Sequence, residues 1–204
     1  EAGASMVILC DTNGGTMPHE VAAITEVVMK TFGIPVGIHT HDDTGVAVAN
    51  ALASILAGAT QIQGTVNGYG ERIGNCNLTT VIPNLQLKMD RHVVEDISQL
   101  THLAHFVDDL ANCAHNIRAP YVGSTAFAHK GGMHVNAVQK VAHSFEHITP
   151  AAVGNRQRIL VSELSGQSNV LMKAAELGLP VEKGSPEALS ILQNLKELEE
   201  QGYE

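Results

Sequence analysis

A strand followed by a helix occurs three times in residues 6–90, and this repetition limits the possible folds more than any other feature. Short apolar runs with the composition of buried strands occupy residues 6–10 (MVILC), 36–39 (VGIH) and 61–66 (QIQGTV). A helical pattern follows each run, over about 18–32, 44–57 and 77–89. Repeated strand–helix pairs indicate parallel strands joined by helical crossovers.

The first helix has the terminal residues that helices favour, with Pro18 at its start and Gly33 just past its end. Val21, Ile24, Val28 and Phe32 fall at helical spacing, so we expect them to form its buried face.

Three such units occupy about 85 residues, so eight would need roughly 230, close to the ~250 of a (β/α)8 barrel. A doubly wound open sheet is the alternative, but the chain has no glycine-rich dinucleotide fingerprint. We therefore predict an α/β fold: the C-terminal part of a (β/α)8 TIM barrel, with about three βα units, followed by a mostly helical subdomain region. Since the first residue is Glu1, we expect the chain to begin inside a larger protein.

The pattern changes after residue 90, which predicts four segments. Residues 1–90 form the barrel units, 91–123 a helical extension and linker, 124–180 small α/β subdomains, and 181–204 a helix that leads to a further domain. Apolar residues at steps of three and four predict a long amphipathic helix within the second segment: Ile97, Leu100, Ala104, Val107 and Ala111. A charged helix is expected at about 186–201.

The composition argues against several partners. The formal net charge is −9, with no Lys/Arg cluster, so neither nucleic acid nor an anionic membrane is expected to bind. No apolar run approaches the ~20 residues of a membrane span. Cys10, Cys76 and Cys113 are odd in number and widely spaced, which favours reduced thiols in a cytoplasmic protein.

His39 and His41 lie near the end of the second strand, in VGIHTHDDTG. Alternation along a strand places both on one face, and barrel enzymes carry their catalytic groups at this end of the strands. Two neutral imidazoles at this spacing can bind one divalent ion, but the pair alone is equally compatible with two ordinary polar residues.

The loop after the third strand, NGYGERIGNCN, brings polar side chains among glycines beside the histidine pair. Asn75 can supply an oxygen ligand, and Glu71 a carboxylate or base. Asn77 is better interpreted as the N-cap of the next helix. Asp43 can cap the helix near Thr44, whereas Asp42 can instead accept a hydrogen bond from a ligating imidazole.

The exit of the first strand, CDTNGGTMP, places three polar residues where a substrate's polar groups can be held: Asp11, Thr12 and Asn13. They are equally ordinary turn residues.

Taken together, DTxGG, HxHDDxG and GERxGN form a joint pattern in this order and spacing. The chain resembles the metal-dependent acyl-CoA condensing enzymes that include 2-isopropylmalate, homocitrate and citramalate synthases. The resemblance runs from Cys10 to at least Gly178. The stretches STAFAHKGGMHVNAV, FEHITPAAVGN and RILVSELSGQSN are most similar to the (R)-citramalate synthase branch.

The resemblance implies that His39, His41 and Asn75 bind a divalent ion, Mg²⁺ or Mn²⁺ and in some members Zn²⁺. The remaining ligand of the family is an aspartate in a DxTLRDG-like motif, which this sequence lacks. Thr12 matches the residue that binds the 2-oxo acid carboxylate, with Asn13 and Arg72 as further substrate-binding candidates. Glu71 matches a glutamate near the acetyl group. His134 matches a histidine that reaches the active site of the partner subunit, so a homodimer is expected.

The implied reaction condenses acetyl-CoA with a 2-oxo acid and hydrolyses the thioester. The branch favours pyruvate and (R)-citramalate, on the route to isoleucine and leucine; 2-isopropylmalate or homocitrate synthesis is the alternative. The resemblance also implies that residues 124–180 contribute to the partner's active site and that a regulatory domain follows residue 204.

One position departs from the family, because Phe145 stands where many relatives carry tyrosine. Two other classes compete with the synthase reading. The first is the metal-dependent lyases and aldolases with related barrels, which also use an HxH pair. The second is an inactive fragment, because the isolated chain has three of the eight barrel units and is expected to have no activity.

Overall fold

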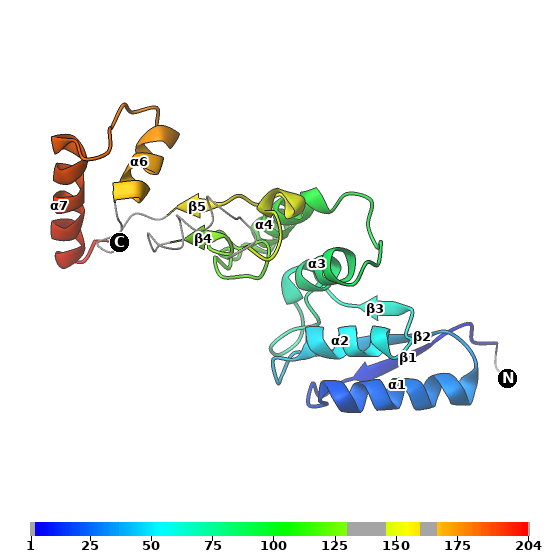
Figure 1. Cartoon of the computed structure of the whole chain (residues 1–204). Helices are drawn as coiled ribbons and strands as arrows, with labels where there is room; N and C mark the ends of the chain where they lie inside the picture. Colours follow the sequence, from blue (N-terminus) through cyan, green and yellow to red (C-terminus); the bar gives the residue numbers. More distant parts are fainter. Residues whose placement is uncertain (1–2, 130–145, 160–166, 204) are drawn as a thin grey trace. The chain divides into compact units, whose positions relative to one another are not determined.

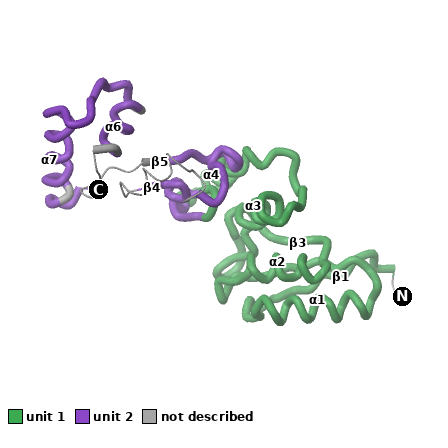
Figure 2. The backbone as a smooth tube through the Cα atoms, in the orientation of Figure 1, with its two compact units in different colours: residues 1–115, 120–122 green, residues 116–119, 123–204 purple. Residues whose placement is uncertain are grey.

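The computed structural model describes residues 3–129, 146–159 and 167–203 (Figure 1). The chain divides into two compact units, which are described separately (Figure 2). The first contains residues 1–115 and 120–122, and the second contains residues 116–119 and 123–204.

The first unit is built on a parallel sheet in the order β1 (Val7–Asp11), β2 (Val36–Thr40), β3 (Gln61–Gln63). Helices α1 (Pro18–Phe32), α2 (Ala47–Leu56) and α3 (Leu78–Lys88) alternate with these strands, and α1 contacts α2 along the sheet (Figure 1). The predicted strand–helix repeat is therefore confirmed. Its core consists of Val21, Ile38, Ala47, Ala51, Cys76, Val81 and Leu85.

The ends of α1 follow from local chemistry. Pro18 occupies its first turn, the Glu20 carboxylate accepts the Met17 N–H at 2.9 Å, and Gly33 closes the helix with φ 63°. The predicted buried face was wrong in two positions. Val21 and Thr25 are buried, whereas Ile24 is 48% exposed and Phe32 58% exposed in the described structure.

Two predicted boundaries also need correction. The third strand ends at Gln63 and not at residue 66, because the chain leaves the sheet at Gly64, where a Cβ would collide with the Cys76 carbonyl. Helix α2 begins at Ala47 and not near Thr44, since Gly45 adopts φ 74° and breaks the helical path.

A short helical turn, η1 (Val66–Gly68), follows β3, and η2 (Ile97–Gln99) precedes helix α4 (Leu100–Ala111). The amphipathic helix predicted from residue 97 is confirmed, and its buried face agrees with the predicted one at Leu100 and Ala104. Leu100, Thr101, Ala104 and Asp108 are buried, and Ala111 is exposed.

The second unit pairs two short parallel strands, β4 (Ala128–His129) and β5 (Arg158–Ile159). The helical turn η4 (Pro150–Val153) lies between these strands in the sequence. Helices α6 (Gln167–Glu176) and α7 (Pro186–Glu200) follow, and α6 contacts both α7 and β5. Helix α7 confirms the charged helix expected at 186–201. In the part of the chain that the structure describes, no helix has the length and apolarity to cross a membrane.

Candidate active site

The two histidines of the HxH motif point toward each other at the end of β2. His39 Nε2 lies 3.4 Å from His41 Nε2, with the rings inclined at 73°. His39 belongs to the strand and is paired in register with Cys10 of β1, while His41 lies just beyond it in an isolated bridge with Asn75. The predicted common face of His39 and His41 is confirmed.

The loop after β3 folds back so that Asn75 lies beside this pair. The Asn75 N–H donates to Gly68 O at 2.9 Å, and its Nδ2 donates to Tyr69 O at 3.1 Å. Gly70 makes room for the amide, because a Cβ at residue 70 would collide with Asn75 Nδ2. With its Nδ2 engaged, the amide presents Oδ1 as its remaining polar atom.

The donor atoms at this end of the sheet fit a divalent ion. Asn75 Oδ1 and His41 Nδ1 are buried and accept or donate no hydrogen bond among the described residues. Across residues 3–129, 146–159 and 167–203, no three His, Cys, Asp or Glu side chains gather as a metal group.

Cys76 follows Asn75 but lies in the core. Burial raises the pKa of its thiol to about 11, which keeps it protonated at neutral pH and unsuited to bind a metal as thiolate.

Arg72 connects the loops that follow all three strands. Its Nε and Nη2 donate to the two carboxylate oxygens of Asp43 at 2.8 and 2.9 Å, and Nη2 also donates to Thr12 O at 2.8 Å. The hydrogen bond from Arg72 lowers the pKa of Asp43, and the Asp43 carboxylate raises that of Arg72.

The two aspartates of the HDD sequence have distinct partners. Asp42 Oδ1 accepts the Ala47 N–H at 2.8 Å, in the first turn of α2, whereas Asp43 binds Arg72. The expectation that Asp43 caps this helix was therefore wrong, because the helix begins later and the Asp43 carboxylate is taken by Arg72. Asn77 caps α3 as predicted, since its Oδ1 accepts the Thr79 N–H at 2.9 Å.

A pocket of about 740 Å³ opens at this end of the sheet, lined by Cys10, Asp11, Thr12, Asn13, Thr16, Asp43 and Arg72. It contains the substrate-binding candidates Thr12, Asn13 and Arg72. Asn13 Oδ1 accepts the Gly15 N–H at 2.9 Å, as in an ordinary turn. Asp11 Oδ1 accepts from the Thr16 hydroxyl at 2.8 Å, while its buried Oδ2 is unpaired among the described residues.

Of the two catalytic candidates, Glu71 and His134, the structure describes Glu71. Glu71 lies on the loop after β3, its side chain 79% exposed and 3.8 Å from Arg72 Nη1. His134 lies outside the described residues, as does Phe145.

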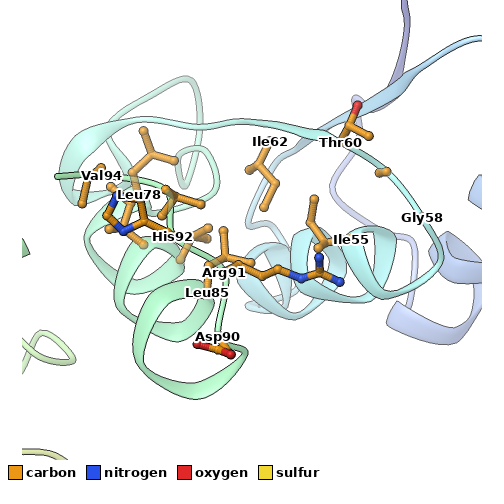
Figure 3. Close-up of a pocket in the computed structure, with 14 residues that line it drawn as sticks. Ile55, Gly58, Thr60, Ile62, Leu78, Leu85, Asp90, Arg91, His92 and Val94 are labelled. Atoms are coloured by element: carbon orange, nitrogen blue, oxygen red, sulfur yellow. The ribbon is translucent and has the colours of Figure 1, made fainter.

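A second pocket, of about 790 Å³, lies in the same unit (Figure 3). Ile55, Ile62, Leu78 and Leu85 from α2, β3 and α3 contribute to a mainly apolar lining, with Arg91 and His92 at its border. None of the candidate ligands or substrate-binding residues lines it.

A buried polar network surrounds Asp108 of α4, which was not among the residues predicted to be functional. Its carboxylate accepts hydrogen bonds from Asn67, Tyr69 and His115. The available signal was a charged residue four positions after Ala104, on the face that the apolar spacing predicts to be buried.

The parallel βα sheet thus carries a histidine pair at the end of β2, with a polar glycine-rich loop beside it. Residues 1–107 match the family model described as HMGL-like, so the chain belongs to the HMGL-like family. Residues 121–203 match the model described as homocitrate synthase post-HMGL domain-like.

The relatives include the (R)-citramalate synthases of Synechocystis, 48% identical, and of Aquifex aeolicus, 50% identical. Each match covers 100% of this chain and 39% of the relative. A probable 2-isopropylmalate synthase of Methanopyrus kandleri is 37% identical, over 99% of this chain and 40% of its own length. The chain thus spans about two fifths of these relatives.

Solved structures support the partial TIM barrel. The HMG-CoA lyase of Bacillus subtilis superposes with a TM-score of 0.52 at 23% identity, covering 59% of this chain and 42% of that one. The carboxyl transferase domain of Rhizobium etli pyruvate carboxylase, solved with pyruvate, gives 0.50 at 20% identity, over 62% of this chain and 22% of that one. The predicted fold class is confirmed.

Proposed function

We propose that the full protein condenses acetyl-CoA with a 2-oxo acid, with pyruvate as the preferred acceptor and (R)-citramalate as the product. The observation that carries the proposal is the His39–His41 pair, with its Nε2 atoms 3.4 Å apart, beside the loop whose Asn75 bridges to His41 and keeps a buried Oδ1 unpaired among the described residues. The high identity to (R)-citramalate synthases supports the choice of reaction.

His39, His41 and Asn75 would hold a divalent ion, Mg²⁺ or Mn²⁺, with Zn²⁺ as the alternative. Two imidazole nitrogens and one amide oxygen are a mixed donor set that suits such ions. When bound, the ion acts as a Lewis acid that polarises the keto group of the 2-oxo acid. Asp42, on the adjoining loop, is proposed to support His41 from outside the ligand set.

The residues of the 740 Å³ pocket would hold the substrate. Thr12 and Asn13 supply short polar side chains beside the end of β1, where a carboxylate can be bound. Arg72 contributes positive charge, and its pairing with Asp43 and Thr12 O keeps the three loops at a fixed spacing. A fixed site favours reaction because the substrates are already oriented.

Glu71 is the proposed group near the acetyl methyl, and His134 the proposed base or water activator. Removal of a methyl proton leaves a carbon nucleophile, which forms a C–C bond with the keto carbon while the keto oxygen takes up a proton. Water then cleaves the thioester, and coenzyme A leaves as a free thiol. Each turnover thus releases one thiol and one hydroxy diacid.

Further elements of the proposal concern the whole protein. We infer a homodimer in which residues 124–180 contribute to the partner's site, and an isoleucine-pathway role in the cytoplasm. Three free cysteines agree with a reducing compartment.

The direct test mixes full-length protein with Mn²⁺ or Mg²⁺, acetyl-CoA and a single 2-oxo acid, and follows thiol release. Pyruvate should give the largest kcat/KM, above 2-oxoisovalerate and 2-oxoglutarate. His41→Ala should abolish turnover, whereas His19→Ala, at an exposed position of α1, should not. Preference for 2-oxoisovalerate would favour 2-isopropylmalate synthesis, in line with the Methanopyrus relative.

No thiol release with any 2-oxo acid would overturn the proposal. If the same protein instead cleaved a hydroxyacyl-CoA, it would belong with the lyases that share this fold.

A further inference from the structure

Asp108 is a buried carboxylate on α4 that has no part in the proposed reaction. The residue is 6% exposed. Its Oδ1 accepts from Asn67 Nδ2 at 2.5 Å and from the Tyr69 hydroxyl at 2.7 Å, while its Oδ2 lies 3.1 Å from His115 Nδ1. A buried carboxylate with several donors is stabilised in place, because loss of any partner leaves a costly unsatisfied group.

Two of these donors belong to the loop that precedes Asn75. Asn67 adopts a left-handed backbone conformation with φ 59°, which is uncommon for a residue with a side chain. Its Nδ2 also donates to Ala104 O at 2.8 Å, so α4 binds the side chain twice. The geometry of residues 66–69 thus depends on contacts with a helix more than 30 residues later in the chain.

The same short segment holds the Asn75 amide. Tyr69 O accepts from Asn75 Nδ2 at 3.1 Å and from the Thr65 hydroxyl, and Gly68 O accepts the Asn75 N–H. The side-chain hydroxyl of Tyr69 faces Asp108, while its carbonyl fixes the direction of the Asn75 amide. The connection from Asp108 to the candidate metal ligand therefore passes through one residue.

We propose that Asp108, acting through Tyr69 and Asn67, is a positioning residue that turns Asn75 Oδ1 toward the ion held by His39 and His41. This inference rests on the proposed metal site. Outer partners that orient a ligand commonly change metal affinity by about 10–100-fold when removed.

The pKa of Asp108 favours an ionised carboxylate in this network. Burial would raise the pKa of Asp108, but the hydrogen bonds from Tyr69, His115 and Asn67 outweigh it and hold that pKa below its usual range. The same contact raises the pKa of Tyr69, so the phenol remains a donor at neutral pH. An ionised acceptor makes the hydrogen bonds to both loop residues stronger than a neutral one would.

The test measures Mn²⁺ affinity of the full protein by electron paramagnetic resonance, with no substrate present. Asp108→Ala should raise the dissociation constant about 10–100-fold, and Tyr69→Phe by a smaller factor. Asp109→Asn is the matched control, because this neighbouring carboxylate is 73% exposed and only approaches His115 at 3.6 Å. It should leave the affinity unchanged.

Two further readouts separate positioning from general damage. In an Asn75→Ala background, Asp108→Ala should produce little additional loss of Mn²⁺ affinity, since the ligand that it orients is absent. Thiol release by the Asp108→Ala protein should recover at high Mn²⁺ concentration, which a misfolded protein would not do.

Unchanged Mn²⁺ affinity in a folded Asp108→Ala protein would overturn the inference. If that variant does not fold, unchanged affinity in Tyr69→Phe overturns it equally. Mn²⁺ binding that responds to Asp108 in a protein without thiol release would preserve the positioning role and reject the proposed reaction.

Discussion

Arg72 shows how one side chain can hold the loops of three different strands. It lies after β3 and binds Asp43 after β2 and the Thr12 carbonyl after β1. The bidentate contact with Asp43 is the strong form of an ion pair, because two parallel N–H groups match two carboxylate oxygens. At the residue scale, Arg72 therefore serves the architecture of the pocket as well as its charge.

This ion pair predicts a pH-dependent effect of Arg72→Met. The folded-state pKa of Asp43 lies below its unfolded value of about 3.9, so the pair contributes stability above pH ~4 and loses it as the pH falls through the lowered pKa. Arg72→Met should reduce the urea midpoint at pH 7 and have a smaller effect near pH 3, where Asp43 has begun to lose the stabilising charge. Chemical unfolding at both pH values measures this.

Lys30→Met is the control for this prediction, because Lys30 makes an exposed pair with Glu26 one helical turn away. It should change the midpoint little at either pH. An Arg72→Met effect of equal size at pH 7 and pH 3 would contradict the assignment to Asp43.

The sequence predicted part of this site and missed the rest for a physical reason. His39 and His41 lie at the end of β2 and Asn75 on the loop after β3, and strand parity with the common edge of a parallel sheet brings them together. Asp108 accepts hydrogen bonds from Asn67 and Tyr69, which lie 41 and 39 positions earlier in the chain. No local periodicity encodes such a contact. Asp42, and not Asp43, binds the first turn of α2, because that helix begins three residues later than predicted.

At the element scale, α1 and α2 are joined by a polar contact inside their interface. Thr25 and Ser54 are fully buried, and their hydroxyl oxygens lie 2.9 Å apart. Thr25 also donates to Val21 O at 2.7 Å. The apolar spacing could not identify this face, because a buried threonine appears polar in a hydrophobic pattern. Ile24 and Phe32 follow that pattern and are nevertheless exposed.

The Thr25–Ser54 contact predicts strong coupling between two substitutions. Thr25→Val or Ser54→Ala alone leaves one buried hydroxyl without this partner and should cost about 1–3 kcal/mol of unfolding free energy. The double variant should cost less than the sum, with a coupling of about 1 kcal/mol. Urea unfolding of the four proteins measures this cycle, and additive losses would show that the hydroxyls do not interact.

The N-terminus of α3 gives a second prediction at this scale. Asn77 Oδ1 accepts from both the Thr79 N–H and its hydroxyl, so Asn77→Ala should cost about 1 kcal/mol. Asn77→Asp keeps an acceptor at the cap and should retain most of the stability. Equal losses in the two variants would exclude capping as the cause.

At the scale of the whole molecule, the sheet of the first unit has two open sides. Its order is β1-β2-β3, and among the described residues no strand pairs with the outer edge of β1 or of β3. A barrel buries such edges by closing on itself, and open edges promote association with other chains. The parallel strand order and helical crossovers follow from the sequence, whereas the described residues form three strands of this sheet, fewer than the eight of a closed (β/α)8 barrel.

These open edges predict the behaviour of the 204-residue polypeptide when it is produced alone. It should self-associate as its concentration rises, because unpaired N–H and C=O groups line both edges of the sheet. It should also release no thiol from acetyl-CoA and pyruvate above a protein-free control, since His39, His41 and Asn75 supply only part of the ligand set that the family implies. Sedimentation velocity over a concentration series, and the thiol assay with Mn²⁺, measure the two effects. The full protein in the same buffers is the control. A monomer that turns over pyruvate at the rate of the full protein would show that these three strands form a sufficient catalytic unit.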